Sequence, residues 1–125
     1  MASNARILVV EDEFIVLRVI CEQLARLGYD VVGTARDGAN GIAEALRLKP
    51  DIVVMDIGLP DMDGIEASRK IMTHSPLPVV VLSAYDDRQR LEEAKAAGAI
   101  GYVVKPIAEQ QLKETIEQAL SGQGQ

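Results

Sequence analysis

The fold of this chain is decided by Asp51–Asp56, DIVVMD, and by the segment that follows it, Ile57–Gly64, IGLPDMDG. The apolar run from Ile52 to Met55 predicts a short strand buried on both faces, as in a parallel sheet covered by helices. This strand ends on a carboxylate, Asp56, and a loop with proline and glycine leads into a helix. Because ligands of open α/β sheets bind beyond the carboxyl ends of the strands, chemistry is expected at Asp56.

The composition is typical of one soluble globular domain. The chain has 125 residues, of which 48% are hydrophobic and 26% are charged, which is enough for a single core. Its net charge of −6 argues against binding to nucleic acid or to an anionic membrane, because both require a basic surface. The single cysteine excludes an internal disulfide, and the sequence has no apolar leader or membrane-length apolar run. We therefore expect an intracellular, cytoplasmic protein.

Strand and helix patterns alternate along the whole chain. The predicted strands are Arg6–Val10, Asp30–Ala35, 51–56, Val79–Leu82 and Gly101–Val104, and the predicted helices are Phe14–Leu27, Ala39–Leu48, Ile65–Thr73, Asp86–Ala97 and Ala108–Leu120. Such alternation predicts a parallel sheet with helices on both faces. Alternation leaves the strand order open, and 2-1-3-4-5 is the common order at this size. We expect the domain to occupy residues 6–120, with a linker or tail at 121–125.

In that strand order, polar side chains at the carboxyl ends of four strands converge. These side chains belong to Glu11, Asp12, Asp56, Ser83 and Lys105. Crowded carboxylates raise one another's pKa or bind a cation, and oxygen ligands suit a hard divalent ion such as Mg²⁺. Asp56 would then attack a phosphoryl group as a nucleophile. Lys105 would meet the phosphoryl oxygens as a point charge, and Ser83 would donate a hydrogen bond.

Four motifs occur in order along the chain. They are Glu11-Asp12, Asp56–Gly64 (DIGLPDMDG), Ser83-Ala84 and Tyr102–Pro106 (YVVKP). In this order and at these separations, the motifs make nearly the whole chain resemble response-regulator receiver domains of two-component signalling. The resemblance implies a flavodoxin-like (βα)5 fold, a three-layer α/β sandwich with five parallel strands in the order 2-1-3-4-5.

The resemblance also implies an acceptor and a metal site. Asp56 is the expected phosphoacceptor. Mg²⁺, or in its place Mn²⁺, is expected on Glu11, Asp12 and Asp56 and on the backbone carbonyl of Gly58. Gly58 and Tyr85 occupy loop positions beside the phosphoryl group, where we expect them to affect how long that group persists.

Further residues are implied to bind the phosphoryl group and to respond to it. Ser83, Ala84 and Lys105 are expected to bind the phosphoryl group, and the Lys105–Pro106 peptide bond is expected to be cis. Ser83 and Tyr102 are the expected switch pair, in which the tyrosine turns inward when the serine moves toward the phosphoryl group.

The predicted function is a phosphorylation-dependent signalling switch. A sensor histidine kinase or a phosphotransfer protein donates the phosphoryl group, and the domain catalyses its own labelling and slow autodephosphorylation without being a turnover enzyme. Phosphorylation is expected to change the face formed by 86–97, 101–104 and 108–120. That face would bind an output domain, a downstream protein or a second copy of the chain. No direct contact with nucleic acid or membrane is expected.

Three alternative functions fit the sequence less well. A degenerate receiver that only contacts proteins is disfavoured because every matched site position is retained. A haloacid-dehalogenase-like phosphatase expects a second aspartate two residues after its nucleophile, where this chain has Gly58. A flavin carrier expects a hydroxyl- and glycine-rich loop after the first strand, where the acidic residues of this chain would repel the flavin phosphate.

Individual residues also have simpler structural interpretations. Ser83 is a possible helix cap, and Tyr102 is a possible packing residue of the sheet. His74 is expected to be exposed near a helix end and is a poor phosphodonor. Cys21 is expected to be buried or half-buried in the first helix.

Overall fold

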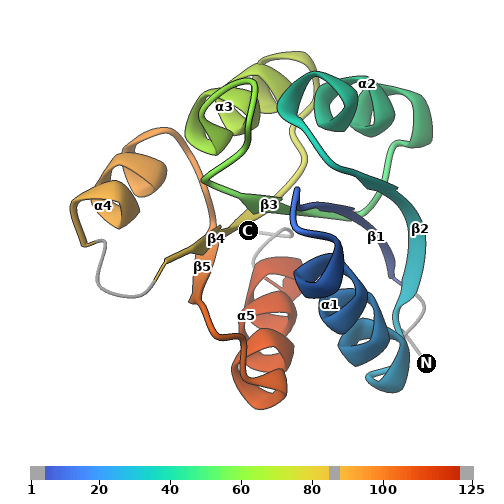
Figure 1. Ribbon diagram of the computed structural model, residues 1–125. Coiled ribbons are helices and arrows are strands. Elements are labelled where there is room, and N and C mark those ends of the chain that lie inside the picture. The colour runs from blue at the N-terminus through green and yellow to red at the C-terminus, as the bar shows by residue number, and fades with distance from the viewer. Residues whose placement is uncertain (1–4, 85–87, 122–125) are drawn as a thin grey trace.

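The structure is a computed structural model that describes residues 5–84 and 88–121. Strands and helices alternate along the chain, as the sequence predicts (Figure 1). Their bounds are β1 (Arg6–Val10), α1 (Phe14–Arg26), β2 (Asp30–Ala35), α2 (Gly38–Leu48), β3 (Ile52–Asp56), α3 (Gly64–His74), β4 (Val79–Ser83), α4 (Arg88–Ala96), β5 (Gly101–Val104) and α5 (Glu109–Ser121).

In the part of the chain that the structure describes, the five strands form one parallel sheet in the order β2-β1-β3-β4-β5. This order confirms the predicted flavodoxin-like arrangement. β3 lies at the centre, and all five of its residues are buried. The carboxyl ends of β1, β3, β4 and β5 therefore lie next to one another at a single edge of the sheet.

Helices cover both faces of the sheet, with α1 and α5 on one side and α2, α3 and α4 on the other (Figure 1). The side chains of β1 alternate between the two cores. Ile7 and Val9 pack in the core beneath α1 and α5, whereas Leu8 and Val10 pack in the core beneath α2, α3 and α4. Each strand of this kind needs apolar residues on both faces, which explains the continuous apolar runs in the sequence.

Local signals set several element ends. α1 ends before Gly28, which has a φ of 92° and is followed by a hydrogen bond from the Tyr29 N–H to the Leu24 carbonyl. β4 includes Ser83, and α4 begins at Arg88, so Ser83 is a strand residue and not the helix cap. None of the described helices is both long enough and apolar enough to cross a bilayer.

The sequence predicts a linker or tail from residue 121 onward, one residue earlier than the structure allows. The helix includes Ser121, and residues 122–125 lie outside the described part of the chain. The structure confirms two predictions about residues on helices. His74, at the end of α3, is exposed, and Cys21 of α1 is half-buried.

Candidate functional site

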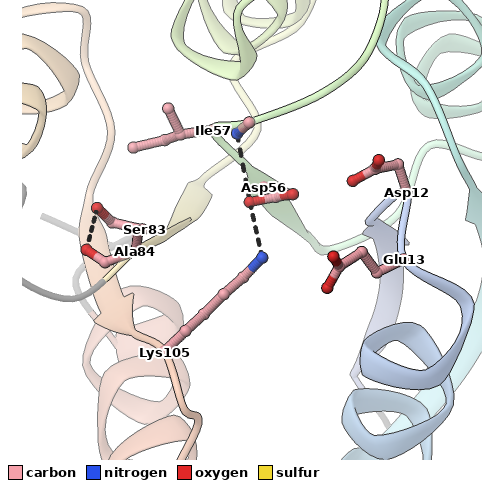
Figure 2. A pocket seen from close by; sticks show the side chains of 8 residues that line it. Asp12, Glu13, Asp56, Ile57, Ser83, Ala84 and Lys105 are labelled. Atoms are coloured by element: carbon pink, nitrogen blue, oxygen red, sulfur yellow. Dashed lines mark hydrogen bonds and ion pairs between the residues drawn. The ribbon is translucent and has the colours of Figure 1, made fainter.

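A polar pocket of about 280 Å³ opens at the carboxyl edge of the sheet (Figure 2). The strands whose ends meet at this edge supply its walls. The lining residues are Asp12, Glu13, Asp56, Ile57, Gly58, Ser83, Ala84 and Lys105. Most of the predicted site residues therefore converge as expected. Glu11 reaches the same cluster from a fully buried position, and Tyr102 does not line the pocket.

Asp56 is the last residue of β3, and its side chain is only 5% exposed. Its Oδ1 accepts a hydrogen bond from the Gly58 N–H at 3.3 Å and lies 3.1 Å from Lys105 Nζ (Figure 2). The Ile57 N–H donates to the Leu82 carbonyl at 3.0 Å, so sheet pairing continues past Asp56. The backbone on both sides of this carboxylate is thus fixed by the central strands.

Lys105 is the cationic side chain among the described residues that line the pocket. Its Nζ lies 3.0 Å from Glu11 Oε1 and 3.1 Å from Asp56 Oδ1. Its N–H donates to the Ser83 carbonyl at 2.8 Å, and the Lys105–Pro106 peptide bond is cis, as predicted. Burial by itself would lower the pKa of Lys105, but the contacts with Glu11 and Asp56 outweigh burial and raise it. The ammonium group therefore stays charged at neutral pH.

Three carboxylates gather beside this lysine. Glu11, Asp12 and Asp56 each place one oxygen within 4.8 Å of the others. Burial raises the pKa of Glu11, although the Glu13 N–H, 3.1 Å from its Oε2, and the Lys105 ammonium act in the opposite direction. Lys105 offsets only part of the negative charge, so the cluster favours a further cation.

The carboxylate oxygens fit a hard divalent cation such as Mg²⁺, which prefers oxygen ligands. Among the described residues, Glu11 Oε1 accepts no hydrogen bond, although it is near enough to Lys105 Nζ for an ion pair. This buried oxygen therefore retains the capacity to interact with a cation. A Cβ atom built on Gly58 would meet no atom within 4 Å, so the space beside that loop residue is open.

The predicted switch residues lie on neighbouring strands, with Tyr102 of β5 opposite Val81, two residues before Ser83 on β4. The Ser83 hydroxyl donates to the Ala84 carbonyl at 3.1 Å (Figure 2). Tyr102 is half-buried against the core on the α4 side, and the Lys95 ammonium lies 5.6 Å from the centre of its ring. Tyr102 is thus a packing residue here, and its inward movement stays a prediction. Tyr85 lies outside the described residues.

Several residues of the site were not singled out from the sequence. Glu13 and Ile57 line the pocket, and the run of three acids that ends at Glu13 was the available signal. Asp61 accepts hydrogen bonds from the N–H groups of Gly38 at 2.7 Å and Ala39 at 2.9 Å, which lower its pKa. This contact between the loop after β3 and the start of α2 has no local sequence signal.

The fold and the pocket define a class of protein: flavodoxin-like α/β domains with acidic residues and a lysine at the carboxyl edge of the sheet. The family model for the response regulator receiver domain matches residues 7–117. The chain belongs to the response-regulator receiver domains of two-component systems, which confirms the resemblance seen in the sequence.

Similar proteins of known sequence or structure are also response regulators. The transcriptional regulatory protein PdtaR of Mycobacterium tuberculosis is 40% identical over 120 residues, which cover 96% of this chain and 58% of PdtaR. This chain thus spans little more than half of that relative's length. A two-component response regulator of the LuxR family from Aurantimonas sp. SI85-9A1 superimposes with a TM-score of 0.90 at 35% identity, covering 95% of this chain and 86% of its own. The response regulator domain of Thermotoga maritima CheB superimposes with a TM-score of 0.87 at 32% identity. The match covers 94% of this chain and 97% of the CheB domain.

Proposed function

We propose that the chain is a phosphorylation-dependent switch in which Asp56 accepts a phosphoryl group from a sensor histidine kinase or a phosphotransfer protein. The observation that carries this proposal is the setting of Asp56. Its nearly buried carboxylate ends the central strand, borders an open pocket and lies 3.1 Å from the Lys105 ammonium. Membership of the receiver family supports the same function. In this proposal the receiver domain, expected at residues 6–120, extends to Ser121 at the end of α5, and the linker or tail expected at 121–125 begins after it.

The transfer uses groups already present in the pocket. A carboxylate oxygen of Asp56 attacks the phosphorus of a phosphohistidine, so that an O–P bond forms and the P–N bond breaks. The imidazole nitrogen leaves with the electron pair of that bond. Lys105 pairs with the phosphoryl oxygens. Ser83 donates its hydroxyl to another phosphoryl oxygen after it turns away from the Ala84 carbonyl, its present acceptor.

Mg²⁺ would be held by Glu11, Asp12, Asp56 and the carbonyl of Gly58. When bound, it supplies positive charge that offsets the repulsion among the carboxylates and orients the phosphoryl oxygens. Among the described residues, the pocket lining has carboxylates but no histidine. In this proposal the domain loses its phosphoryl group slowly and acts as a signal, without substrate turnover.

An apolar groove of about 240 Å³ lies beside the pocket and shares Lys105 with it. Its lining residues are Ile15, Val16, Val19, Lys105, Pro106 and Ile107. Ile15 is 75% exposed. A donor histidine must come within bonding distance of Asp56, so the protein that carries it must cover the adjoining surface. We propose that the kinase or phosphotransfer protein binds in this groove.

The downstream partner is proposed to bind the α4-β5-α5 face. The contact of Lys95 with the Tyr102 ring joins α4 to β5 at this face, so a movement of the tyrosine would alter its surface. An output domain, a separate protein or a second copy of the chain would recognise that change.

The test is the intact mass after incubation with acetyl phosphate, with and without Mg²⁺. We expect the native chain to gain about 80 Da, the mass of one phosphoryl group, only when Mg²⁺ is present. Asp56→Asn should gain nothing, whereas Asp30→Asn, at an exposed carboxylate on β2, should behave like the native chain. Labelling that persists in Asp56→Asn would show that the nucleophile is another residue.

A further inference from the structure

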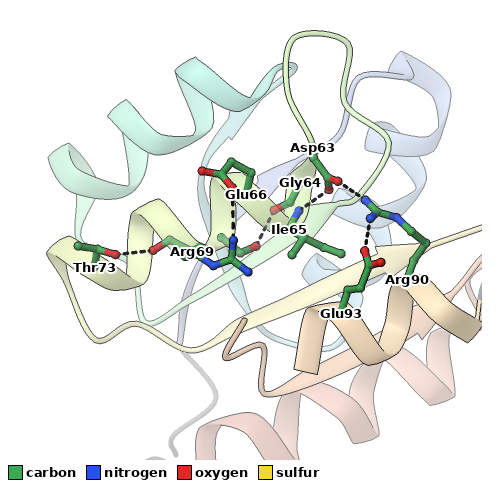
Figure 3. Close-up of polar contacts among 9 residues, drawn as sticks. Asp63, Gly64, Ile65, Glu66, Arg69, Thr73, Arg90 and Glu93 are labelled. Carbon is green, nitrogen blue, oxygen red and sulfur yellow. Dashed lines mark hydrogen bonds and ion pairs between the residues drawn. The ribbon is translucent and has the colours of Figure 1, made fainter. Parts of the chain in front are cut away.

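Asp63 joins three parts of the molecule next to the Asp56 site (Figure 3). As the N-cap of α3, its Oδ1 accepts a hydrogen bond from the Ile65 N–H at 2.9 Å. Its Oδ2 forms an ion pair with Arg90 of α4. Its backbone makes an isolated antiparallel bridge to Gly58, two residues beyond Asp56. Asp63 thus lies between the phosphoacceptor loop and α4.

Arg90 is held firmly in this contact. Figure 3 shows its guanidinium between the carboxylates of Asp63 and Glu93, and its side chain is only 27% exposed. Burial by itself would raise the pKa of Asp63, but the bonds from Arg90 and from the Ile65 N–H outweigh burial and lower it. Both partners therefore stay charged at neutral pH, and the pair is a persistent link between α4 and the loop.

The loop between Asp56 and Asp63 has little freedom to absorb movement. The Gly64 N–H donates to the Ile57 carbonyl at 2.8 Å. A Cβ atom on Gly64 would lie 2.0 Å from the carbonyl oxygen of Asp56, so the two backbone segments are in direct contact. A displacement at Gly58 is therefore passed on to Asp63 instead of being lost within the loop.

The other end of the link lies on α4, because Arg90 belongs to the first turn of that helix as the structure describes it. A shift of Asp63 would therefore act on α4 through the Arg90 guanidinium.

We propose that the Arg90–Asp63 ion pair holds α4 in the arrangement of the unmodified protein, and thereby lowers the affinity of the Asp56 site for a phosphoryl group. This rests on the proposed function. Arg90 acts through Asp63 and is a positioning residue. Because coupling between two sites is reciprocal, a phosphoryl group on Asp56 weakens the ion pair, and loss of the ion pair favours phosphoryl binding.

The test uses fluoroberyllate with Mg²⁺ as a mimic of the phosphoryl group, titrated into ¹⁵N-labelled full chain and followed by NMR. Two variants remove the ion pair in different ways. Arg90→Gln removes the cation, and Asp63→Asn removes the charge while keeping a good N-cap. The matched control is Arg47→Gln, because Arg47 forms a similar arginine–carboxylate pair with Glu44 within α2.

We expect each variant to bind fluoroberyllate roughly two- to fivefold more tightly than the native chain, since a partly exposed ion pair is a modest interaction. The double variant should bind no more tightly than either single variant, and Arg47→Gln should match the native chain. In the native chain, the Arg90 Nε–Hε signal should shift as fluoroberyllate binds. This signal reports the ion pair independently of phosphorylation activity.

Other results would overturn the inference. One is that the native chain binds fluoroberyllate without a change in the Arg90 signal, and another is that the two variants bind it no more tightly than the native chain does. In either case, the ion pair does not hold α4 in the arrangement of the unmodified protein. The proposed function would then still stand. If the native chain neither binds fluoroberyllate nor is labelled by acetyl phosphate, both the proposed function and this inference are wrong.

Discussion

Lys105 balances the charges of the pocket. Its ammonium group lies 3.0 Å from a carboxylate oxygen of Glu11 and 3.1 Å from one of Asp56. Removing one partner of a buried ion pair leaves the other charge without compensation, which costs more than the pair itself contributes. The lysine proposed to bind the phosphoryl group is therefore also needed for the stability of the unmodified domain.

Lys105→Met should lower the free energy of unfolding by about 1–3 kcal/mol at pH 7, because Glu11 and Asp56 lose their cation. The folded-state pKa of Lys105 is raised, so its stabilisation is complete below the unfolded pKa near 10.5 and is lost as pH rises through the folded pKa. Urea unfolding at a series of pH values should show the native chain and the variant converging above pH 10.5.

Tyr29 also has a raised pKa because of burial, and its ionisation destabilises the folded state over the same alkaline range. Both proteins retain Tyr29, so the difference between them isolates the lysine. A difference in stability that stays constant with pH would contradict the assignment to Lys105.

At the scale of elements, the loop after β3 is held by the helices around it. Asp61 accepts hydrogen bonds from the first two N–H groups of α2, and Asp63 caps α3 and pairs with Arg90 of α4. α1 has a different role, because it presents exposed apolar residues beside the pocket. Under the proposed function, the donor protein binds at α1, and α2, α3 and α4 hold the loop that follows the phosphoacceptor.

Ile15→Ser should lower phosphotransfer from a protein donor about tenfold, because an isoleucine side chain buried at an interface contributes roughly 1.5–3 kcal/mol. Labelling by acetyl phosphate should not change, since this small donor needs no groove. The measurement compares both rates, with purified autophosphorylated histidine kinases as protein donors.

Ile100→Ser is the matched control, because Ile100 is also exposed, at 45%, but lies outside the lining of the groove. Its two rates should match those of the native chain. If Ile15→Ser slows both donors equally, its effect is on the Asp56 site, and the groove is not the docking surface.

At the scale of the whole molecule, the two cores on either side of the sheet hold the strand ends in register. The carboxylates of the acidic cluster lie at the end of the sheet, beyond these cores, and repel one another in the folded state. A ligand that binds only the folded state stabilises it by mass action. Cation binding at the pocket should therefore be visible in global unfolding.

Mg²⁺ at ten times its dissociation constant should add about 1.4 kcal/mol to the free energy of unfolding of the native chain. Asp12→Asn removes one of the three clustered carboxylates and should lose most of this gain. Glu117→Gln, an exposed acid on α5, should keep it. Thermal unfolding with and without Mg²⁺ gives the comparison. Equal stabilisation of all three proteins would place the ion elsewhere on the surface.

The sequence by itself determined the alternation of strands and helices and the family. Both depend on local patterns of residues, because the apolar run at Ile52–Met55 is typical of a strand buried on both faces, and helix ends such as Gly28 carry their own signal. The sequence also located Asp56 and Lys105 at strand ends, and it indicated the cis bond before Pro106 through the resemblance of its motif.

Only the tertiary structure decided how these local pieces meet. The alternation is compatible with more than one strand order, and the order β2-β1-β3-β4-β5 is what brings Glu11, Asp56 and Lys105 within ion-pair distance. The Arg90–Asp63 pair spans 27 residues of sequence. Such contacts depend on how helices pack against the sheet, and no local pattern of residues encodes that packing.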